Sequence, residues 1–170
     1  MRRNIALVGF MGTGKSSVGK VLAKKTGRKL VDIDREIEVA EKRKIAEIFA
    51  QDGEPRFRAL EKEAIARASS GGNAVITTGG GAVTDPANLE ALKAGGVVVA
   101  LWATPETIHR RVKDSKARPL LNVADVPGEI RRLLESRRPF YEKADHHFHT
   151  DGRTASQVAG MILEKLRDLA

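Results

Sequence analysis

The chain has 170 residues, of which 41% are hydrophobic, and this fits a single domain with a core of its own. Cysteine is absent, which excludes a disulfide framework or a thiolate metal site, and no apolar run reaches the roughly 20 residues that span a bilayer, so we expect a cytoplasmic protein without a membrane partner. The formal net charge of +8 is interleaved with acids, and aromatics make up only 4%, which favours small anionic substrates over nucleic acid.

The first predicted elements are a buried strand over residues 4–8 and a helix over 17–25, and Gly9-Phe10-Met11-Gly12-Thr13-Gly14-Lys15-Ser16 connects them. This stretch matches the phosphate-loop motif G-x-x-x-x-G-K-[ST] in its strand–loop–helix context. The glycines let backbone N–H groups point at a polyphosphate, and the helix adds its positive end. Lys15 would reach the β- and γ-phosphates, and the Ser16 hydroxyl would bind Mg²⁺. The predicted nucleotide contacts are Gly12, Thr13, Gly14, Lys15, Ser16 and Ser17.

A second strand is predicted over residues 29–34, and it ends in Asp32 and Asp34. Because ligands gather at the carboxyl ends of parallel strands, we expect these acids beside the phosphate loop. One can then serve Mg²⁺ and the other an acceptor hydroxyl. The alternative is that they only cap the next helix, where Asp is favoured. Helices are predicted over 35–49 and 56–69, broken by a turn at 51–55 because proline cannot continue a helix.

A third strand over residues 74–78 runs into Gly79, Gly80 and Gly81, which permit close approach by a ligand or, alternatively, form a strained turn. Further helices are predicted over 86–93, 105–113, 127–141 and 155–169, and strands over 97–102 and 146–149. Strands that alternate with helices predict an α/β fold with a parallel sheet covered on both faces. Residues 113–126 are polar, basic and long for a connection, which is typical of a lid.

Other charged residues give weak signals when each is taken alone. Arg58 and Glu61 lie three residues apart on one helix, which indicates a surface ion pair. Arg110, Arg118 and Arg137 indicate solvated surface charges. The histidines at 146, 147 and 149 have no evident acidic or cysteine partner, so we predict no metal site there.

Taken together, the motifs resemble the shikimate kinase family over essentially the whole chain. The first three are the phosphate loop, Asp32-x-Asp34 and Gly53-Glu54-x-x-Phe57-Arg58-x-x-Glu61. Three more are Gly79-Gly80-Gly81-Ala82-Val83, Arg118-Pro119-Leu120-Leu121 and Arg137-x-Pro139-x-Tyr141. Six motifs in order at compatible spacing make coincidence negligible.

The resemblance implies ATP-dependent phosphorylation of the 3-hydroxyl of shikimate, in the route to aromatic amino acids. Asp34 then contacts the hydroxyls of the substrate, and we interpret it as an orienter more than a base because phosphoryl transfer needs little base assistance. Arg58 and Arg137 bind the carboxylate, and the backbone of Gly79, Gly80 and Gly81 lines the same pocket.

On the nucleotide side, the resemblance makes Lys15 and the lid residue Arg118 catalytic together with Asp34. Asp32 organises one Mg²⁺ through water beside Ser16. Arg110 stacks on adenine, and Arg153 falls in the adenine loop.

The family fold that the resemblance implies is a three-layer αβα sandwich with five parallel strands, like that of nucleoside monophosphate kinases. We expect one phosphate-loop kinase domain over residues 1–170, with a helical substrate-binding segment at about 33–61 and a lid at about 113–126. We also expect a monomer.

Three alternative functions compete with this interpretation. A gluconate or nucleotide kinase of the same fold would share the phosphate loop, and gluconate also has a carboxylate and hydroxyls. A GTP-binding switch would need Asn-Lys-x-Asp for guanine, which the chain does not contain. Binding of nucleic acid would depend on net charge alone.

Overall fold

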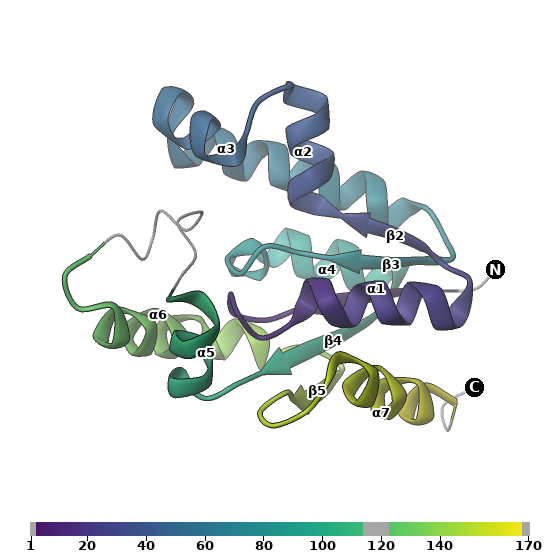
Figure 1. Ribbon diagram of the computed structural model, residues 1–170. Coiled ribbons are helices and arrows are strands. Elements are labelled where there is room, and N and C mark those ends of the chain that lie inside the picture. The colour runs from purple at the N-terminus through teal and green to yellow at the C-terminus, as the bar shows by residue number, and fades with distance from the viewer. Residues whose placement is uncertain (1–2, 114–122, 168–170) are drawn as a thin grey trace.

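The computed structural model describes residues 3–113 and 123–167. The strands are β1 (Asn4–Val8), β2 (Lys29–Asp32), β3 (Ala74–Thr77), β4 (Gly96–Trp102) and β5 (His146–His149). The helices are α1 (Lys15–Thr26), α2 (Ile33–Glu41), α3 (Ile45–Ser70), α4 (Pro86–Gly95), α5 (Pro105–Val112), α6 (Val126–Tyr141) and α7 (Ala155–Arg167), with a 3-10 turn, η1, at Ala82–Thr84. Figure 1 shows how these elements alternate along the chain.

A parallel sheet in the order β2-β3-β1-β4-β5 forms the middle layer. β1 lies at its centre, where it pairs with β3 on one side and β4 on the other. The chain therefore reverses its direction of winding next to β1, and the loops that follow β1 and β3 meet at one edge of the sheet. This is where open α/β sheets bind ligands. The predicted five-stranded α/β sandwich is confirmed.

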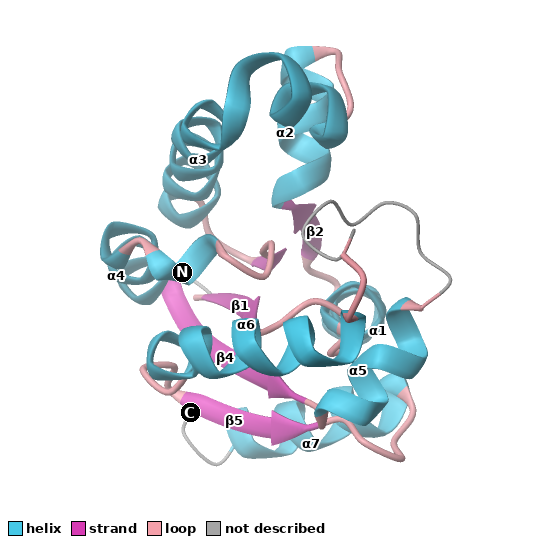
Figure 2. Cartoon of the chain, turned by 90° about the vertical axis from the view of Figure 1, so that its left-hand side faces the viewer, coloured by secondary structure: helices cyan, strands magenta, loops and turns pink. Residues whose placement is uncertain are grey.

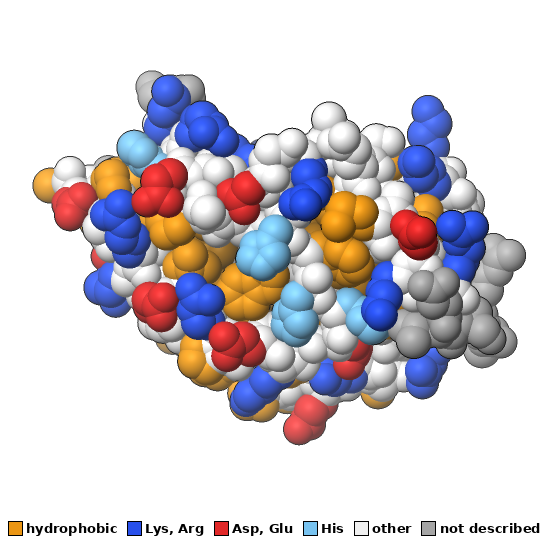
Figure 3. All heavy atoms as spheres, turned by 90° about the horizontal axis from the view of Figure 1, so that it is seen from below, with side chains coloured by type: hydrophobic (Ala, Val, Ile, Leu, Met, Phe, Trp, Pro, Cys, Tyr) orange, Lys and Arg blue, Asp and Glu red, His pale blue; other side chains and the backbone are white. Residues whose placement is uncertain are grey.

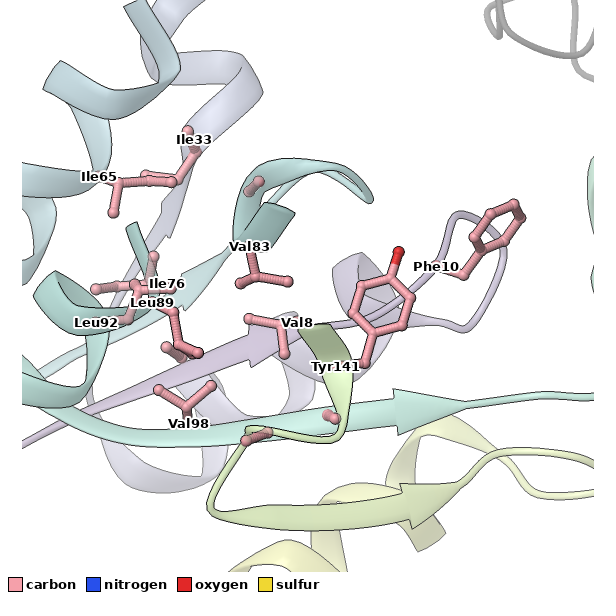
Figure 4. Close-up of a cluster of buried hydrophobic side chains, with 14 of the residues drawn as sticks. Val8, Phe10, Ile33, Ile65, Ile76, Val83, Leu89, Leu92, Val98 and Tyr141 are labelled. Atoms are coloured by element: carbon pink, nitrogen blue, oxygen red, sulfur yellow. The ribbon is translucent and has the colours of Figure 1, made fainter. Parts of the chain in front are cut away.

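Helices cover both faces of the sheet because successive residues of a buried strand point to opposite sides. Ile5 and Leu7 of β1 pack against α1 and α7, which lie on the same side of the sheet in Figure 1. Ala6 and Val8 belong to a second core with α3, α4 and α6. Figure 4 shows part of that second core, in which Val8, Val83 and Tyr141 lie side by side.

The structure differs from the predicted helices in the segment after β2. The helix expected over 35–49 is interrupted: α2 ends at Glu41, and Lys42 has the positive φ of 55°. The break expected at 51–55 is a kink inside α3, where Gly53 has φ 81° and Pro55 follows. Asp34 does not end a strand but lies in the first turn of α2. In Figure 2 these two helices lie at the top of the view, above β2, and the C-terminal part of α3 packs against α4 and the core.

The predicted lid falls largely on residues 114–122, which lie outside the described part of the chain, and Val126 already belongs to α6. Within the described residues, no helix combines the length and apolar content that a membrane span requires.

Candidate active site

The phosphate loop begins where β1 ends and closes where α1 begins. Gly12 and Gly14 have φ of 76° and 99°, values that favour glycine, so the loop can take its shape only with these residues. Gly14 caps α1 without any side-chain hydrogen bond to the helix start. The N-terminus of α1 is therefore open to an anion, which its backbone N–H groups and dipole attract.

A cavity of about 350 Å³ lies over this loop. Its walls are Met11, Gly12, Gly14, Lys15, Ser16, Ser17, Asp34, Thr78, Gly79, Gly80 and Arg111. The structure thus brings together the predicted phosphate-loop contacts other than Thr13, one predicted acid and two of the three predicted glycines. Most of these residues come from the carboxyl ends of β1 and β3 and from the starts of α1 and α2, as the parallel topology requires, and Arg111 comes from the end of α5.

Lys15 and Thr13 support the loop from within. The Lys15 ammonium donates to the carbonyl oxygens of Gly9 and Phe10 at 2.6 and 2.9 Å, and its side chain is largely buried. The Thr13 hydroxyl donates to Phe10 O at 2.7 Å and is 1% exposed. The Thr13 backbone is engaged as well, since its N–H donates to Phe10 O at 3.3 Å, so Thr13 supports the loop whereas Lys15 borders the cavity.

Gly79, Gly80 and Gly81, named here the glycine turn, contact both the phosphate loop and the predicted substrate arginines. A Cβ atom at Gly80 would lie 3.2 Å from Met11 N and 3.3 Å from Arg137 Nη1. At Gly81 it would lie 2.5 Å from Arg58 Nη2. A side chain at Gly81 would displace the Arg58 guanidinium, and one at Gly80 would crowd Met11 N and Arg137, so close approach accounts for glycine at both positions. The prediction of close approach is consistent with this packing.

Asp34 faces the cavity as a buried carboxyl group. Its Oδ1 atom is buried and accepts no hydrogen bond from any described residue. Burial raises the pKa of Asp34, the charge of Asp32 raises it further, and Lys15 opposes the shift. An unpaired buried oxygen is costly unless a ligand supplies the donor. A substrate hydroxyl at this position would satisfy it.

Asp32 has a different environment. Its side chain accepts from Arg35 N at 3.1 Å, which caps α2 as the alternative interpretation predicted. Asp32 and Asp34 both line a groove along α2, and Asp34 alone of the two reaches the phosphate-loop cavity.

Arg58 and Glu61 form an ion pair of 2.7 Å, but it is not the surface pair that the spacing indicated. The Glu61 residue is 0% exposed, and Arg58 also contacts the more exposed Glu54 at 3.2 Å. Burial raises the pKa of Glu61, and the neighbouring Arg58 opposes this shift. The second oxygen of Glu61 has no hydrogen-bond partner within residues 3–113 and 123–167. Glu61 therefore holds the guanidinium of Arg58 at the glycine turn.

Arg137 is also buried, although taken alone it indicated a solvated charge. Its guanidinium lies 5.7 Å from the centre of the Phe10 ring and touches the position of Gly80. Arg58 and Arg137 thus lie against adjacent glycines of one turn. Two guanidinium groups at one place suit a carboxylate, whose two oxygens accept paired N–H donors.

Arg111, which the sequence did not single out, lies at the phosphate loop. It donates to Gly12 O at 3.0 Å and to the side chain and backbone oxygens of Thr150 at 3.0 and 3.1 Å. The Thr150 hydroxyl in turn donates to Thr13 O at 2.8 Å. Arg110, predicted at the adenine, instead contacts Thr107 at 3.4 Å and does not line the cavity. Its role stays a prediction.

The other predicted nucleotide contacts are less defined. Arg153 is exposed and donates to His149 O at 3.1 Å, beside the end of β5. Arg118 lies outside the described residues.

Figure 3 shows histidine side chains in pale blue on one face of the molecule, and of the histidines of β5, His147 and His149 are exposed and His146 is partly buried. The ring of His147 accepts a hydrogen bond of 3.1 Å from the Trp102 indole. In the portion of the chain that the structure describes, no three His, Asp or Glu side chains are placed to bind a metal ion.

Comparisons with known proteins agree with this geometry. The family model described as "Shikimate kinase" matches residues 11–167. The shikimate kinase of Symbiobacterium thermophilum is 47% identical and covers 97% of each chain. That of Thermodesulfovibrio yellowstonii is 45% identical, over 99% of this chain and 97% of its own.

Solved structures give the same result. A shikimate kinase from Acinetobacter baumannii in complex with shikimate has a TM-score of 0.96 and 38% identity, over 99% of this chain and 94% of that one. A gluconokinase from Sinorhizobium meliloti has a TM-score of 0.63 at 17% identity, over 100% of this chain and 95% of that one, and therefore shares the fold alone. The extent and identity of the matches, together with the phosphate loop and glycine turn, establish that the chain belongs to the shikimate kinase family.

Proposed function

We infer that the chain transfers the terminal phosphoryl group of ATP to the 3-hydroxyl of shikimate, giving shikimate 3-phosphate and ADP. Phosphorylation of shikimate with ATP is the activity of its family. The relative from Acinetobacter baumannii is a complex with shikimate, which supports the choice of acceptor. The observation that carries the inference is that Asp34, Arg58 and Arg137 meet the phosphate loop at the glycine turn.

The phosphate loop and the start of α1 hold the polyphosphate of ATP in this proposal. Gly12 and Gly14 contribute backbone N–H groups, Thr13 keeps the loop in shape by donating to Phe10 O, and Ser16 and Ser17 lie at the open helix end. Lys15 adds a positive charge where negative charge builds up on the transferred group, which is the main catalytic contribution in phosphoryl transfer.

The residues present also fit one Mg²⁺ ion. The Ser16 hydroxyl borders the cavity, and Asp32 offers a carboxylate nearby on the groove along α2. Mg²⁺ prefers a few protein oxygens together with water and substrate phosphates, so a hydroxyl and one water-linked carboxylate suffice. When bound, the ion would neutralise phosphate charge.

The acceptor lies between Asp34 and the glycine turn in this proposal. The Asp34 carboxylate, whose Oδ1 is buried and unpaired, accepts a hydrogen bond from the 3-hydroxyl and orients it toward the phosphate. Arg58 and Arg137 hold the carboxylate at the other end of the ring. Because the buried site has polar groups for both the hydroxyl and the carboxylate of the substrate, it rejects analogues that lack either group.

We extend the proposal to the untested residues and properties. Arg118 closes over the phosphates from the lid at about 113–126, Arg110 and Arg153 contact the base, and Arg111 supports the loop that holds the phosphates. We propose a single domain over residues 1–170, with its substrate-binding segment at about 33–61. We also propose a cytoplasmic monomer that binds neither nucleic acid nor membranes.

An ADP-release assay with a panel of acceptors tests the proposal. Shikimate should give the highest kcat/KM, and gluconate and nucleoside monophosphates should give little turnover. Faster turnover of gluconate or a nucleotide would overturn the assignment. Replacing ATP with GTP in the same assay distinguishes a kinase from a guanine-nucleotide switch.

A further inference from the structure

The carbonyl groups of the glycine turn are engaged by donors of the protein itself. Gly79 O accepts from Ala82 N at 3.2 Å. Gly81 O accepts from the backbone N–H of Thr84 at 3.2 Å and from its hydroxyl at 2.7 Å. The N–H groups of residues 79–81 donate to no residue in the described part of the chain. The turn can therefore offer free N–H donors to a ligand, whereas the carbonyl oxygens of Gly79 and Gly81 already accept hydrogen bonds from the protein.

The remaining carbonyl, that of Gly80, accepts a hydrogen bond from the hydroxyl of Tyr141, 61 positions away in the sequence. The peptide between Gly80 and Gly81 is trans, since no cis peptide bond is found in the described residues. In a planar trans peptide the C=O and N–H groups point in opposite directions. By holding Gly80 O, Tyr141 therefore also determines where the Gly81 N–H points.

Tyr141 is well placed to hold this peptide rigidly. It is the single tyrosine of the chain and is 1% exposed at the end of α6. Its ring packs edge-on against Trp102, with ring centres 5.8 Å apart. Figure 4 shows the hydroxyl turned away from the strands on which the ring rests.

The Tyr141 hydroxyl stays protonated at neutral pH and can therefore donate a hydrogen bond. Burial raises the pKa of Tyr141 to about 12, although the charge of Arg137 opposes the shift. Arg137 lies one helical turn before Tyr141 on α6, and its Nη1 atom lies 3.3 Å from the position that a Cβ at Gly80 would take. Helix α6 thus carries both Arg137, which is predicted to bind the substrate, and Tyr141, which holds the Gly80–Gly81 peptide.

We propose that Tyr141 is a positioning residue for the acceptor pocket. Its hydroxyl holds the Gly80–Gly81 peptide so that the Gly81 N–H faces the substrate, and it keeps the glycine turn against Arg137. Tyr141 itself does not touch the substrate. This inference rests on the proposed function, because it assigns the glycine turn to the shikimate pocket.

Tyr141→Phe removes the hydroxyl and keeps the ring. We expect KM for shikimate to rise roughly fivefold or more, while KM for ATP stays within about twofold, because only ground-state binding of the acceptor is weakened. Ser136→Ala is the matched control, since it removes from the same helix a hydroxyl that donates to Leu133 O at 2.8 Å. The control should leave both KM values unchanged.

A second measurement does not depend on the folding of a variant. Because Tyr141 is the sole tyrosine, biosynthetic incorporation of fluorotyrosine places one fluorine label at this position and nowhere else. Its ¹⁹F resonance should shift on saturation with shikimate and respond much less to ADP. A tyrosine that only fills the core would give a resonance that shikimate does not move.

The outcomes separate this inference from the proposed function. If the unaltered enzyme fails to phosphorylate shikimate, the proposed function is wrong. If it phosphorylates shikimate but the ¹⁹F resonance does not shift on saturation with shikimate, Tyr141 has no positioning role. An unchanged KM for shikimate in a folded Tyr141→Phe variant would likewise overturn the positioning role.

Discussion

One methyl group added at Gly81 tests the role of Arg58 without altering Arg58 itself. The added Cβ of Gly81→Ala would lie 2.5 Å from Arg58 Nη2 and 3.0 Å from both Cζ and Nη1. Gly81 has φ −96° and ψ 0°, which any L-residue adopts, so the substitution introduces no backbone strain. The guanidinium ends a flexible side chain and can retreat, by about 0.9 Å, to an ordinary contact of 3.4 Å.

A displacement of this size affects binding far more than stability. Charge-assisted hydrogen bonds contribute about 1.5–3 kcal/mol each, so misaligning one of them to the substrate carboxylate raises KM for shikimate roughly 10- to 150-fold. The melting temperature should fall only modestly, because the Arg58 side chain is 29% exposed and can shift, although the shift strains its ion pair with the buried Glu61. KM for ATP should not change, because the phosphate loop keeps its own contacts.

Steady-state ADP release, with each substrate varied at saturation of the other, measures both KM values. Gly71→Ala provides the matched control: its φ is −74°, and its new Cβ would make only an ordinary contact of 3.6 Å with Ala68 O. The reasoning fails if Gly81→Ala leaves KM for shikimate unchanged, or if KM for ATP rises in its place.

Three further substitutions test the rest of the site. Lys15→Ala should slow phosphoryl transfer by more than about tenfold, or about 1.4 kcal/mol, in single-turnover kinetics. A smaller loss would show that Lys15 does not stabilise the transition state. Arg111→Ala should raise KM for ATP and leave KM for shikimate unchanged, because Arg111 supports the loop through Gly12 O. A variant with a raised KM for shikimate and an unchanged KM for ATP would contradict this role. Asp34→Asn should lower turnover, because an amide oxygen orients the hydroxyl less strongly than a carboxylate does, yet stabilise the fold at neutral pH. Since the pKa of Asp34 is raised in the folded state, ionising the group costs stability as pH rises above its ordinary value of 3.8. The gain in melting temperature should therefore grow from acidic to neutral pH, and kcat/KM of the unaltered enzyme should fall as Asp34 is protonated; a gain that is independent of pH would refute the shift.

Local sequence was sufficient for the phosphate loop and the sheet. Both depend on signals carried by neighbouring residues: glycines where φ is positive, apolar runs of strand length, and helical spacing between them. The same holds for the glycine turn, whose position after β3 follows from chain order. Parallel topology then places the ends of β1 and β3 side by side, so the common site could be predicted before any contact was known.

Helix boundaries between β2 and β3 were predicted less well. Pro55 is a strong local signal, but the chain continues through it with only a kink at Gly53. The break that the structure does contain depends on Lys42, a residue with no intrinsic preference for positive φ. Packing of α2 against α3 decides its position, and no window of sequence contains that information.

Burial of the charged residues was decided by tertiary structure alone. Glu61 and Arg137 have the residue types and spacing of surface charges, yet both are buried. Glu61 packs against Arg58, and Arg137 packs against Gly80. Likewise, only the rotation of α5 about its axis determines that Arg111, and not Arg110, meets the phosphate loop. Sequence can state which groups a chain carries and which strand ends meet. Which of these charged groups are buried depends on how the other helices and strands pack against them.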